Sequence, residues 1–438
     1  MAARSNKLGG YDLYRSLGCP KFIVAPMVDQ SELAWRRLSR RYGAQLIYTP
    51  MINAKIFAET PSDKIRNANF DLASGEEGDP TTDRPLVVQF CSNDPERLLA
   101  AARLVENNCD AVDLNLGCPQ DIARRGRYGS FLQDDWDLIY RLINVLHENL
   151  SIPVTAKFRV FPTVERTVEY AKMLERAGAQ ILTCHGRIRE QRGHNTGLAD
   201  WEKIRAVKQA VSVPVFANGN ILYQSDVTTC LAATGADGVM SAEGQLYNAA
   251  LFHGLATDGG RIPMSPENKE YLSNDFIFLR HPRHVDLALE YLDIVKRLRT
   301  ATTVSGAKGH LFKIMRPALI REVDLRERLG RVKANPKRLE TGVVAEGDRK
   351  GIQWNGWEEY EEVVKEMKVR MERDEAAMND SLLKNLIAVD PKTGFDLYPH
   401  WLAQPYFRPL PLVANRKPAK EDECDIQSNA TNGSPVPV

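Results

Sequence analysis

The sequence contains no Cys-x-x-Cys pair, no cluster of zinc ligands and no long apolar run. Its seven cysteines are odd in number and scattered, at positions 19, 91, 109, 118, 184, 230 and 424. This spacing argues against a zinc-type site and favours free thiols in a reducing compartment. The longest apolar stretches, such as residues 213–217, are far too short to span a bilayer, and residues 1–10 lack the apolar segment of a secretory signal. We therefore expect a protein of the cytoplasm or nucleus that is not secreted, spans no membrane and holds no metal.

A strong charge of one sign is also missing. The formal net charge is +1 at pH 7, so the field of the whole molecule does not indicate a nucleic-acid binder. Any RNA interface must therefore rest on a local patch. A chain of 438 residues with ordinary apolar and charged fractions is long enough for one large domain and a smaller one. We expect a monomer.

Between residues 21 and 252, short β-rich runs alternate with longer amphipathic segments. This alternation predicts strands at residues 22–25, 46–48, 86–90, 111–115, 153–157, 181–184, 213–217 and 238–240. It predicts helices at residues 31–42, with Ser31 as a cap, and at 95–106, 134–148, 164–177, 200–210 and 225–233. Residues 59–84, rich in Gly, Pro and Asp, are expected to form an extended loop.

Eight strands with intervening helices indicate a (β/α)8 TIM barrel. The competing fold is a doubly wound sheet, which would show a Gly-rich dinucleotide turn after its first strand. This chain has Pro26-Met27-Val28 at that position, so the barrel is favoured. We predict an N-terminal arm at 1–20, the barrel at 21–260, a helical domain at 261–330, a C-terminal extension at 331–412 with an irregular start and a charged helix, and a disordered tail at 413–438.

Functional groups of such barrels gather at the carboxyl ends of the strands, and most of the predicted strand ends here are polar. The side chains concerned are those of Gln89, Asn115, Cys118, Lys157, Arg159, His185, Arg187, Asn218 and Asn220. Singly, several have structural explanations: Gln89 and His185 as hydrogen-bonded scaffold residues, and Asn218-Gly219 as a turn. Lys157 is different, because a lysine that ends an apolar strand needs an anionic partner.

Jointly, these strand ends are accounted for by a bound flavin mononucleotide (FMN). Gln89 and Lys157 would hydrogen-bond the pyrimidine edge of the isoalloxazine, and Met27 would offer an apolar surface to the ring. The loops after the seventh and eighth strands would hold the phosphate.

Five segments also resemble the dihydrouridine synthases, in that family's order and over residues 20–320. They are Val24-Ala25-Pro26-Met27, Leu114-Asn115-Leu116-Gly117-Cys118-Pro119, Lys157-Phe158-Arg159, Cys184-His185-Gly186-Arg187 and Asn218-Gly219-Asn220-Ile221. The Asn-x-Gly-Cys-Pro motif is specific, whereas Ala-Pro-Met and Asn-Gly-Asn are shared with other flavin barrels. Residues 28–51, 89–95 and 240–244 are most similar to the eukaryotic branch that acts on tRNA positions 16 and 17.

The resemblance implies a set of FMN contacts in this sequence. They are Pro26, Met27, Val28, Gln89, Lys157, His185, Asn218, Gly219, Asn220, Ala242 and Glu243. The last pair departs from the family, many members of which carry Gly-Arg there. Because a carboxylate would repel a phosphate, we expect backbone N–H groups to hold the phosphate and Glu243 to point away.

The resemblance also implies a reaction, the reduction of the uracil C5–C6 double bond in the D-loop of tRNA. NADPH, or NADH, would reduce FMN, N5 of which would pass hydride to C6, while Cys118 would donate a proton to C5. A thiol with a pKa near its reference value of about 8.5 is mostly protonated at neutral pH, which suits a proton donor. Asn115 would bond the uracil edge, and Arg159 and Arg187 would contact RNA or another anion.

Because the uracil must leave its stack to reach a flavin, we expect recognition of tRNA by shape and phosphates more than by base sequence. A helix predicted at residues 307–320 carries Lys308, His310, Lys313 and Arg316, which form either a phosphate-facing patch or a solvated face. Two other functions stay open at this point. One is a flavin barrel that reduces a free pyrimidine or enone, and the other is a tRNA-binding protein without catalysis.

Overall fold

In the computed structural model, eight of the nine strands of the main sheet close into a parallel barrel. The structure describes residues 7–255, 273–341, 351–378, 382–391 and 393–406. In barrel order the strands are β1 (Phe22–Val24), β2 (Leu46–Tyr48), β4 (Leu86–Cys91), β5 (Ala111–Leu116), β6 (Val154–Arg159), β7 (Leu182–His185), β8 (Val215–Asn218) and β9 (Gly238–Ser241). The pairs β2–β4 and β1–β9 complete the ring, so the predicted TIM barrel is confirmed.

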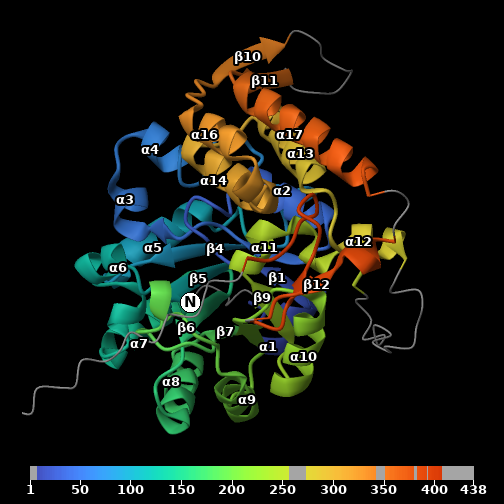
Figure 1. The fold of residues 1–438 in the computed structure, drawn as a ribbon. Helices are drawn as coiled ribbons and strands as arrows, with labels where there is room; N and C mark the ends of the chain where they lie inside the picture. The colour runs from blue at the N-terminus through green and yellow to red at the C-terminus, as the bar shows by residue number, and fades with distance from the viewer. Residues whose placement is uncertain (1–6, 256–272, 342–350, 379–381, 392, 407–438) are drawn as a thin grey trace, which may run out of the picture.

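Helices surround this barrel as the alternation predicts (Figure 1). They are α2 (Leu33–Arg41), α5 (Pro95–Val105), α7 (Trp136–Asn149), α8 (Val164–Arg176), α9 (Trp201–Ala210) and α10 (Gln224–Thr234). Several begin at a capping side chain, such as Asp94, which accepts from the N–H groups of Glu96 and Arg97. The predicted cap at Ser31 is wrong, because its hydroxyl instead accepts a hydrogen bond from the N–H of Met27.

The segment between β2 and β4 is more ordered than its composition predicts. Strand β3 (Ile52–Asn53) pairs with β4, and Asn53 caps α3 (Ala54–Glu59). The expected loop at 59–84 contains the short helix α4 (Asp63–Asn67). Arg66 of α4 donates to the carbonyls of Phe57 and Thr60. Hydrophobic periodicity does not indicate such a polar contact.

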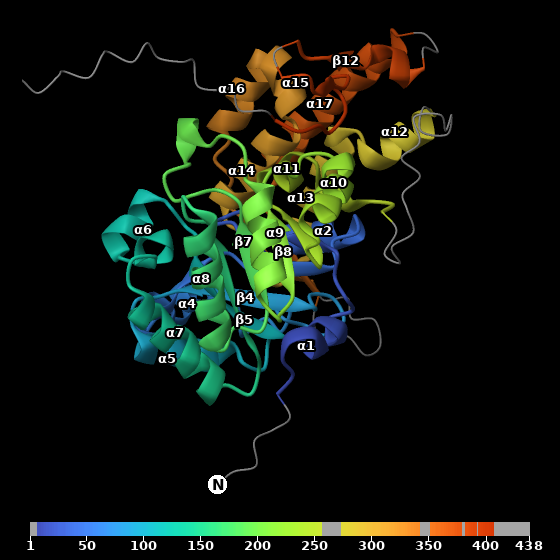
Figure 2. The same cartoon turned by 90° about the horizontal axis from the view of Figure 1, so that it is seen from below.

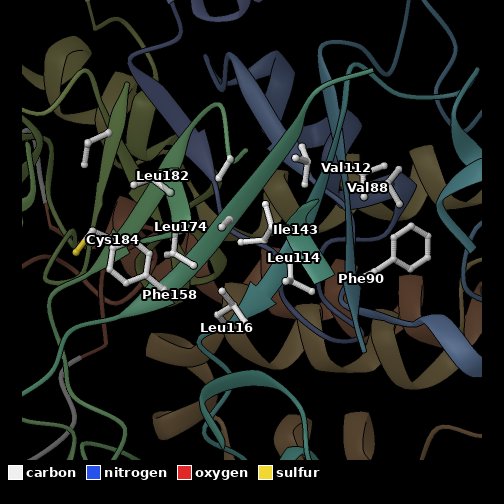
Figure 3. Close-up of a cluster of buried hydrophobic side chains, with 14 of the residues drawn as sticks. Val88, Phe90, Val112, Leu114, Leu116, Ile143, Phe158, Leu174, Leu182 and Cys184 are labelled. Carbon is white, nitrogen blue, oxygen red and sulfur yellow. The ribbon is translucent and has the colours of Figure 1, made fainter. Parts of the chain in front are cut away.

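Buried side chains form one core inside the barrel and another between the barrel and its helices. The inner core includes Ile23, Tyr48, Phe216 and Met240. The outer core, part of which is shown in Figure 3, includes Val88, Phe90, Val112, Leu114, Leu116, Ile143, Phe158, Leu174, Leu182 and Cys184. Helix α1 (Gly10–Ser16), in the predicted N-terminal arm, contributes Leu13 and Tyr14 to the inner core, so part of this arm packs against the barrel.

A second group of helices lies to one side of the barrel (Figures 1 and 2). It comprises α12 (Asn274–Arg280), α13 (His284–Arg297), α14 (Val304–Ile314), α15 (Arg316–Arg321), α16 (Val323–Arg331) and α17 (Glu358–Ala376). Pro317 was expected to kink the helix predicted at 307–320 or to end it early, and this is confirmed: the segment is divided into α14 and α15, with Pro317 in the first turn of α15. Residues on both sides of position 330 share one core, which also takes in α2.

Residues 333–352 contain part of a hairpin that was predicted as irregular. Strands β10 (Lys337–Thr341) and β11 (Gly351–Asn355) pair antiparallel. Each strand pairs with a segment distant in sequence, which explains why local composition did not indicate it.

Smaller elements are α6 (Asp121–Gly126), α11 (Glu243–Tyr247), β12 (Ala388–Val389), β13 (Asp396–Leu397), and the 3-10 turns Gly129–Leu132, Gly193–Asn195, Ala249–Phe252 and Leu383–Leu386. The predicted tail at 413–438 lies outside the described residues.

In the part of the chain that the structure describes, no helix is both long and apolar enough to cross a membrane. The same residues contain no group of three or more His, Cys, Asp or Glu side chains arranged to hold a metal ion.

Candidate active site

The predicted polar strand ends meet at one end of the barrel because strand register places them side by side. Asn115 of β5 is the register partner of Lys157 of β6, and Arg159 of β6 is the partner of His185 of β7. His185 in turn is level with Asn218 of β8. Residues that are far apart in sequence therefore line a continuous arc.

A chain of buried hydrogen bonds orders the part of this arc on β4, β5 and β6. The side-chain amide of Asn115 donates to Gln89 Oε1 at 2.8 Å, and Gln89 Nε2 donates to Asp113 Oδ2 at 2.8 Å. Asp113 also accepts from the hydroxyl of Thr155 at 2.6 Å. Burial raises the pKa of Asp113 to about 6, although the hydrogen bonds from Thr155 and Gln89 oppose the rise.

Asp113 was absent from the residues proposed from sequence. It holds Gln89 in one orientation, because an ionised carboxylate only accepts and so requires the NH2 of Gln89 to face it. A signal was present: Asp113 is an acidic residue within an apolar strand. It lies two positions before Asn115, and therefore on the same face of the strand.

Asn115 also shapes the turn that carries the candidate thiol. Its Oδ1 accepts hydrogen bonds from the N–H groups of Gly117 at 3.2 Å and Cys118 at 3.0 Å. Both ends of this amide are therefore used within the protein. The predicted contact between Asn115 and uracil stays a prediction.

Cys118 lies partly exposed after β5, packed against a small cluster that contains Cys91 and Tyr128. Its carbonyl accepts from both the N–H and the hydroxyl of Ser130, which closes the loop between them. Burial raises the pKa of the Cys118 thiol, while the backbone N–H of Gln120 and the charges of Arg159 and Lys157 oppose the rise. The thiol is therefore protonated at neutral pH.

Lys157 is a buried cation that donates to an amide oxygen. Its Nζ donates to Asn218 Oδ1 at 2.9 Å, and the NH2 of Asn218 donates to the carbonyl of Met240 at 2.8 Å. Burial, together with the charge of Arg159, lowers the pKa of Lys157 to about 8, and Asp113 opposes this. Among the described residues, Lys157 forms no ion pair, so the site retains a positive charge that a bound anion would satisfy.

His185, Arg187 and Asn220 form a second hydrogen-bonded unit across β7 and the loop after β8. Arg187 Nη1 lies 3.2 Å from His185 Nε2, and Nη2 donates to Asn220 Oδ1 at 2.7 Å. Since a guanidinium only donates, His185 accepts at Nε2. Burial and the charges of Lys157, Arg159 and Arg187 lower the pKa of His185 well below its usual range, so the ring is neutral.

Between these residues, Gly219 permits a close approach of the backbone. Its φ is +116°, and a Cβ there would lie 2.6 Å from Ala199 Cβ and 3.1 Å from the ring of His185. Asn220, also at positive φ, accepts from the N–H of Ala199 through Oδ1. The loop after β8 is therefore held close to the ring of His185.

Arg159 was predicted to contact RNA or another anion at the mouth of the cavity, but it is largely buried. Its guanidinium donates to the carbonyls of Gly117 at 2.8 Å, Ile188 at 2.9 Å and Gln191 at 3.1 Å. Burial and the charge of Arg187 lower the pKa of Arg159 to about 10. Arg159 thus holds the turn that precedes Cys118.

The remaining predicted cofactor residues lie on the loops after β1 and β9. Pro26 and Val28 flank Met27, which packs against both the barrel core and the helical core, while Val28 is exposed. Ala242 precedes α11, and Glu243 is its first residue. Burial lowers the pKa of Lys313 on α14, and the carboxylate of Glu243 opposes this, so Glu243 acts on a cation of the helical group.

Residues 23–312 match the family model described as dihydrouridine synthase (Dus). The chain belongs to this family. The predicted membership is thereby confirmed, and the match extends from the barrel into α14.

Curated relatives match this family member over most of its length. The Saccharomyces cerevisiae protein named tRNA-dihydrouridine(16/17) synthase (NAD(P)(+)) is 44% identical over 100% of this chain and 95% of its own. The Rattus norvegicus protein named tRNA-dihydrouridine(16/17) synthase (NAD(P)(+))-like is 45% identical over 94% of this chain and 80% of its own. The Homo sapiens tRNA-dihydrouridine(20a/20b) synthase-like protein is 36% identical over 53% of this chain and 70% of its own.

The helical group of this Dus protein does not present the predicted phosphate-facing patch. His310 is fully buried, its ring stacks 4.1 Å from that of Trp35, and its Nε2 lies 3.0 Å from Glu32 Oε2. Lys308 donates to two backbone carbonyls, and Lys313 to Gln30 Oε1 at 2.7 Å. The fourth cation, Arg316, lies 3.6 Å from the ring centroid of Tyr406. All four side chains contact groups of the protein itself. The prediction that His310 faces a phosphate is therefore wrong, and the prediction for Lys308, Lys313 and Arg316 loses support.

Proposed function

We propose that this protein reduces a uridine in the D-loop of tRNA, at position 16 or 17, with FMN as cofactor and NADPH or NADH as reductant. One observation carries the proposal: a protonated thiol, Cys118, ends the β5 turn next to the buried cation Lys157, in a barrel of the dihydrouridine synthase family. The position in tRNA follows the printed names of full-length relatives.

The residues present fit a flavin. Lys157 is a buried ammonium with spare donors, and in the described structure it forms no ion pair, which suits the electron-rich edge of an isoalloxazine. Gly219 lets the loop after β8 pack directly against Ala199 and the ring of His185, which fixes that loop at the rim where the flavin phosphate would lie. When bound, FMN would supply the hydride that reduction of the C5–C6 double bond needs.

Cys118 would supply the proton. The S–H bond breaks as the new C5–H bond forms, which leaves a thiolate on Cys118. The charges of Lys157 and Arg159 favour that thiolate, as their opposition to the raised pKa of Cys118 shows. Asn115 and Arg159 would act as positioning residues, since both hold the turn before the thiol by hydrogen bonds to its backbone.

In a direct test, the purified protein is incubated with NADPH and unmodified tRNA, and dihydrouridine is then mapped along the tRNA. The expected product is dihydrouridine at position 16 or 17, with Cys118→Ala nearly inactive and still yellow. Cys19→Ala, which removes an exposed thiol elsewhere, serves as the matched control and keeps activity. A Cys118→Ala protein that works at the wild-type rate refutes the acid assignment. Reduction of free uracil with none of tRNA refutes the proposed substrate.

A further inference from the structure

Helix α6 begins three residues after Cys118, and the helix and its C-cap carry a cluster of exposed arginines, here called the α6 arginines. Arg124, Arg125 and Arg127 are all exposed at the surface. In the described structure, none of their guanidinium groups donates a hydrogen bond or forms an ion pair. The nearest acidic side chain on the helix, Asp121, is bound by Arg192 at 2.8 Å. None of the three is thus bound to a carboxylate, although the charges of Arg124 and Arg125 act on Asp121.

The other arginines near the carboxyl ends of β5, β6 and β7 already bind groups of the protein. Arg159 is bound to three carbonyls and Arg187 to His185 and Asn220. Arg189 pairs with Asp134 at 2.8 Å, and Arg192 donates to Pro119 and Asp121. The α6 arginines therefore differ from their neighbours in contact as well as in exposure. Figures 1 and 2 both show α6 well apart from α16 and α17.

The loop that carries α6 is anchored at the candidate active site. Ser130 binds the carbonyl of Cys118 through two groups and so ties the two ends of the loop together. Tyr128 is buried, and its ring packs so closely on Gly126 that a Cβ there would lie 2.2 Å from it. Three peptide units separate Asp121 from Cys118, so the start of α6 is at most about 11 Å from the thiol residue.

A loop anchored this close to the thiol is placed to contact the backbone of an extruded nucleotide. A base that enters the site brings its own phosphate and the next one to the rim, and these charges must be held there. Arginine binds phosphate oxygens in a fork geometry, and it contacts the backbone without reading base sequence. Resting on the proposed tRNA substrate, we propose that Arg124, Arg125 and Arg127 bind the phosphates that flank the uridine to be reduced.

The test compares the full-length wild type with the variant Arg124→Gln/Arg125→Gln/Arg127→Asn, in which Asn tolerates the positive φ of position 127. The measured quantities are the tRNA dissociation constant over a salt series, KM and kcat for uridine reduction, and the rate of flavin reduction by NADPH without RNA. The expected loss of tRNA affinity is on the order of 10- to 100-fold, with a salt slope smaller by up to about 2. Flavin reduction and kcat at saturating tRNA should stay near wild type.

Two matched variants separate a local effect from a general loss of charge. Lys172→Gln/Arg176→Gln removes two exposed cations from α8, and should leave tRNA affinity within about twofold of wild type. Arg326→Gln/Lys333→Gln/Lys337→Gln, here called the helical-group variant, removes exposed cations of α16 and of the segment from α16 to β10. The proposal is overturned if the α6 variant keeps the wild-type affinity and salt slope, or if only the helical-group variant loses them. A wild type that binds tRNA but forms no dihydrouridine refutes the proposed function instead, and leaves the binding comparison intact.

Discussion

The side-chain oxygen of Asn115 accepts a hydrogen bond from the backbone N–H of Cys118 at 3.0 Å, while its NH2 donates to Gln89 at 2.8 Å. One amide thus joins the turn that carries the candidate acid to the strand that carries a candidate flavin ligand.

Asn115→Ala should therefore slow uridine reduction without preventing flavin binding. Loss of the amide frees the Cys118 turn, and a misplacement of about 1 Å can lower a rate on the order of 100-fold. We expect kcat to fall about 10- to 100-fold, with flavin reduction by NADPH nearly unchanged. Asn149→Ala, at the exposed end of α7, is the control. An unaltered kcat in Asn115→Ala would show that the turn needs no such support.

Lys157→Met should weaken flavin binding and change the pH dependence of stability. Burial lowers the pKa of Lys157 to about 8, below its usual value of 10.5. The charged form is therefore disfavoured by folding, and this penalty is relieved as pH rises from about 8 toward 10. Flavin-free wild type should gain stability against urea across that window. Lys157→Met should lack the gain, whereas Lys172→Met, at an exposed lysine, should retain it. Equal slopes in all three proteins would contradict the buried charge.

Gly219→Ala should destabilise the protein more than a glycine replacement in open space. A Cβ at position 219 would lie 2.6 Å from Ala199 Cβ, at a φ of +116°. We expect a loss of about 2–4 kcal/mol in the free energy of unfolding, together with loss of bound flavin. Gly235→Ala, where φ is +67° and no atom lies within 4 Å, should cost about 1 kcal/mol. Denaturant titrations of both variants measure the difference, and similar losses would mean that the loop moves aside.

His310→Ala should act on stability and not on phosphate binding. The ring is fully buried against Trp35 and bonded to Glu32, so its removal leaves a cavity and an unpaired acceptor at the contact between α2 and α14. A loss of about 2–4 kcal/mol is expected in urea unfolding. Ser305→Ala, on the exposed face of α14, should cost little. If folded His310→Ala binds tRNA with a smaller salt slope than wild type, His310 contributes to phosphate binding after all.

Local pattern was sufficient to predict the barrel and to bring its polar strand ends to one rim. The strand at residues 111–115 and the helix at 95–106 were predicted to within about two residues of β5 and α5, because burial on a strand or helix face repeats along the chain. The polar ends of the strands could be placed together from sequence, since parallel strands bring their carboxyl ends to one rim. The hairpin of β10 and β11 was missed, because its strands depend on each other.

The sequence by itself determined the barrel, the family and the position of Cys118 at a strand end, because all three follow from patterns among residues that are close in sequence. Only the tertiary structure decided which cations are available to a ligand. Arg159 and His310 are buried against partners distant in sequence, whereas Arg124 and Arg125 stay exposed. It also revealed how Asp113 orients Gln89. Burial and partner choice depend on segments that meet only after folding, and no local pattern encodes them.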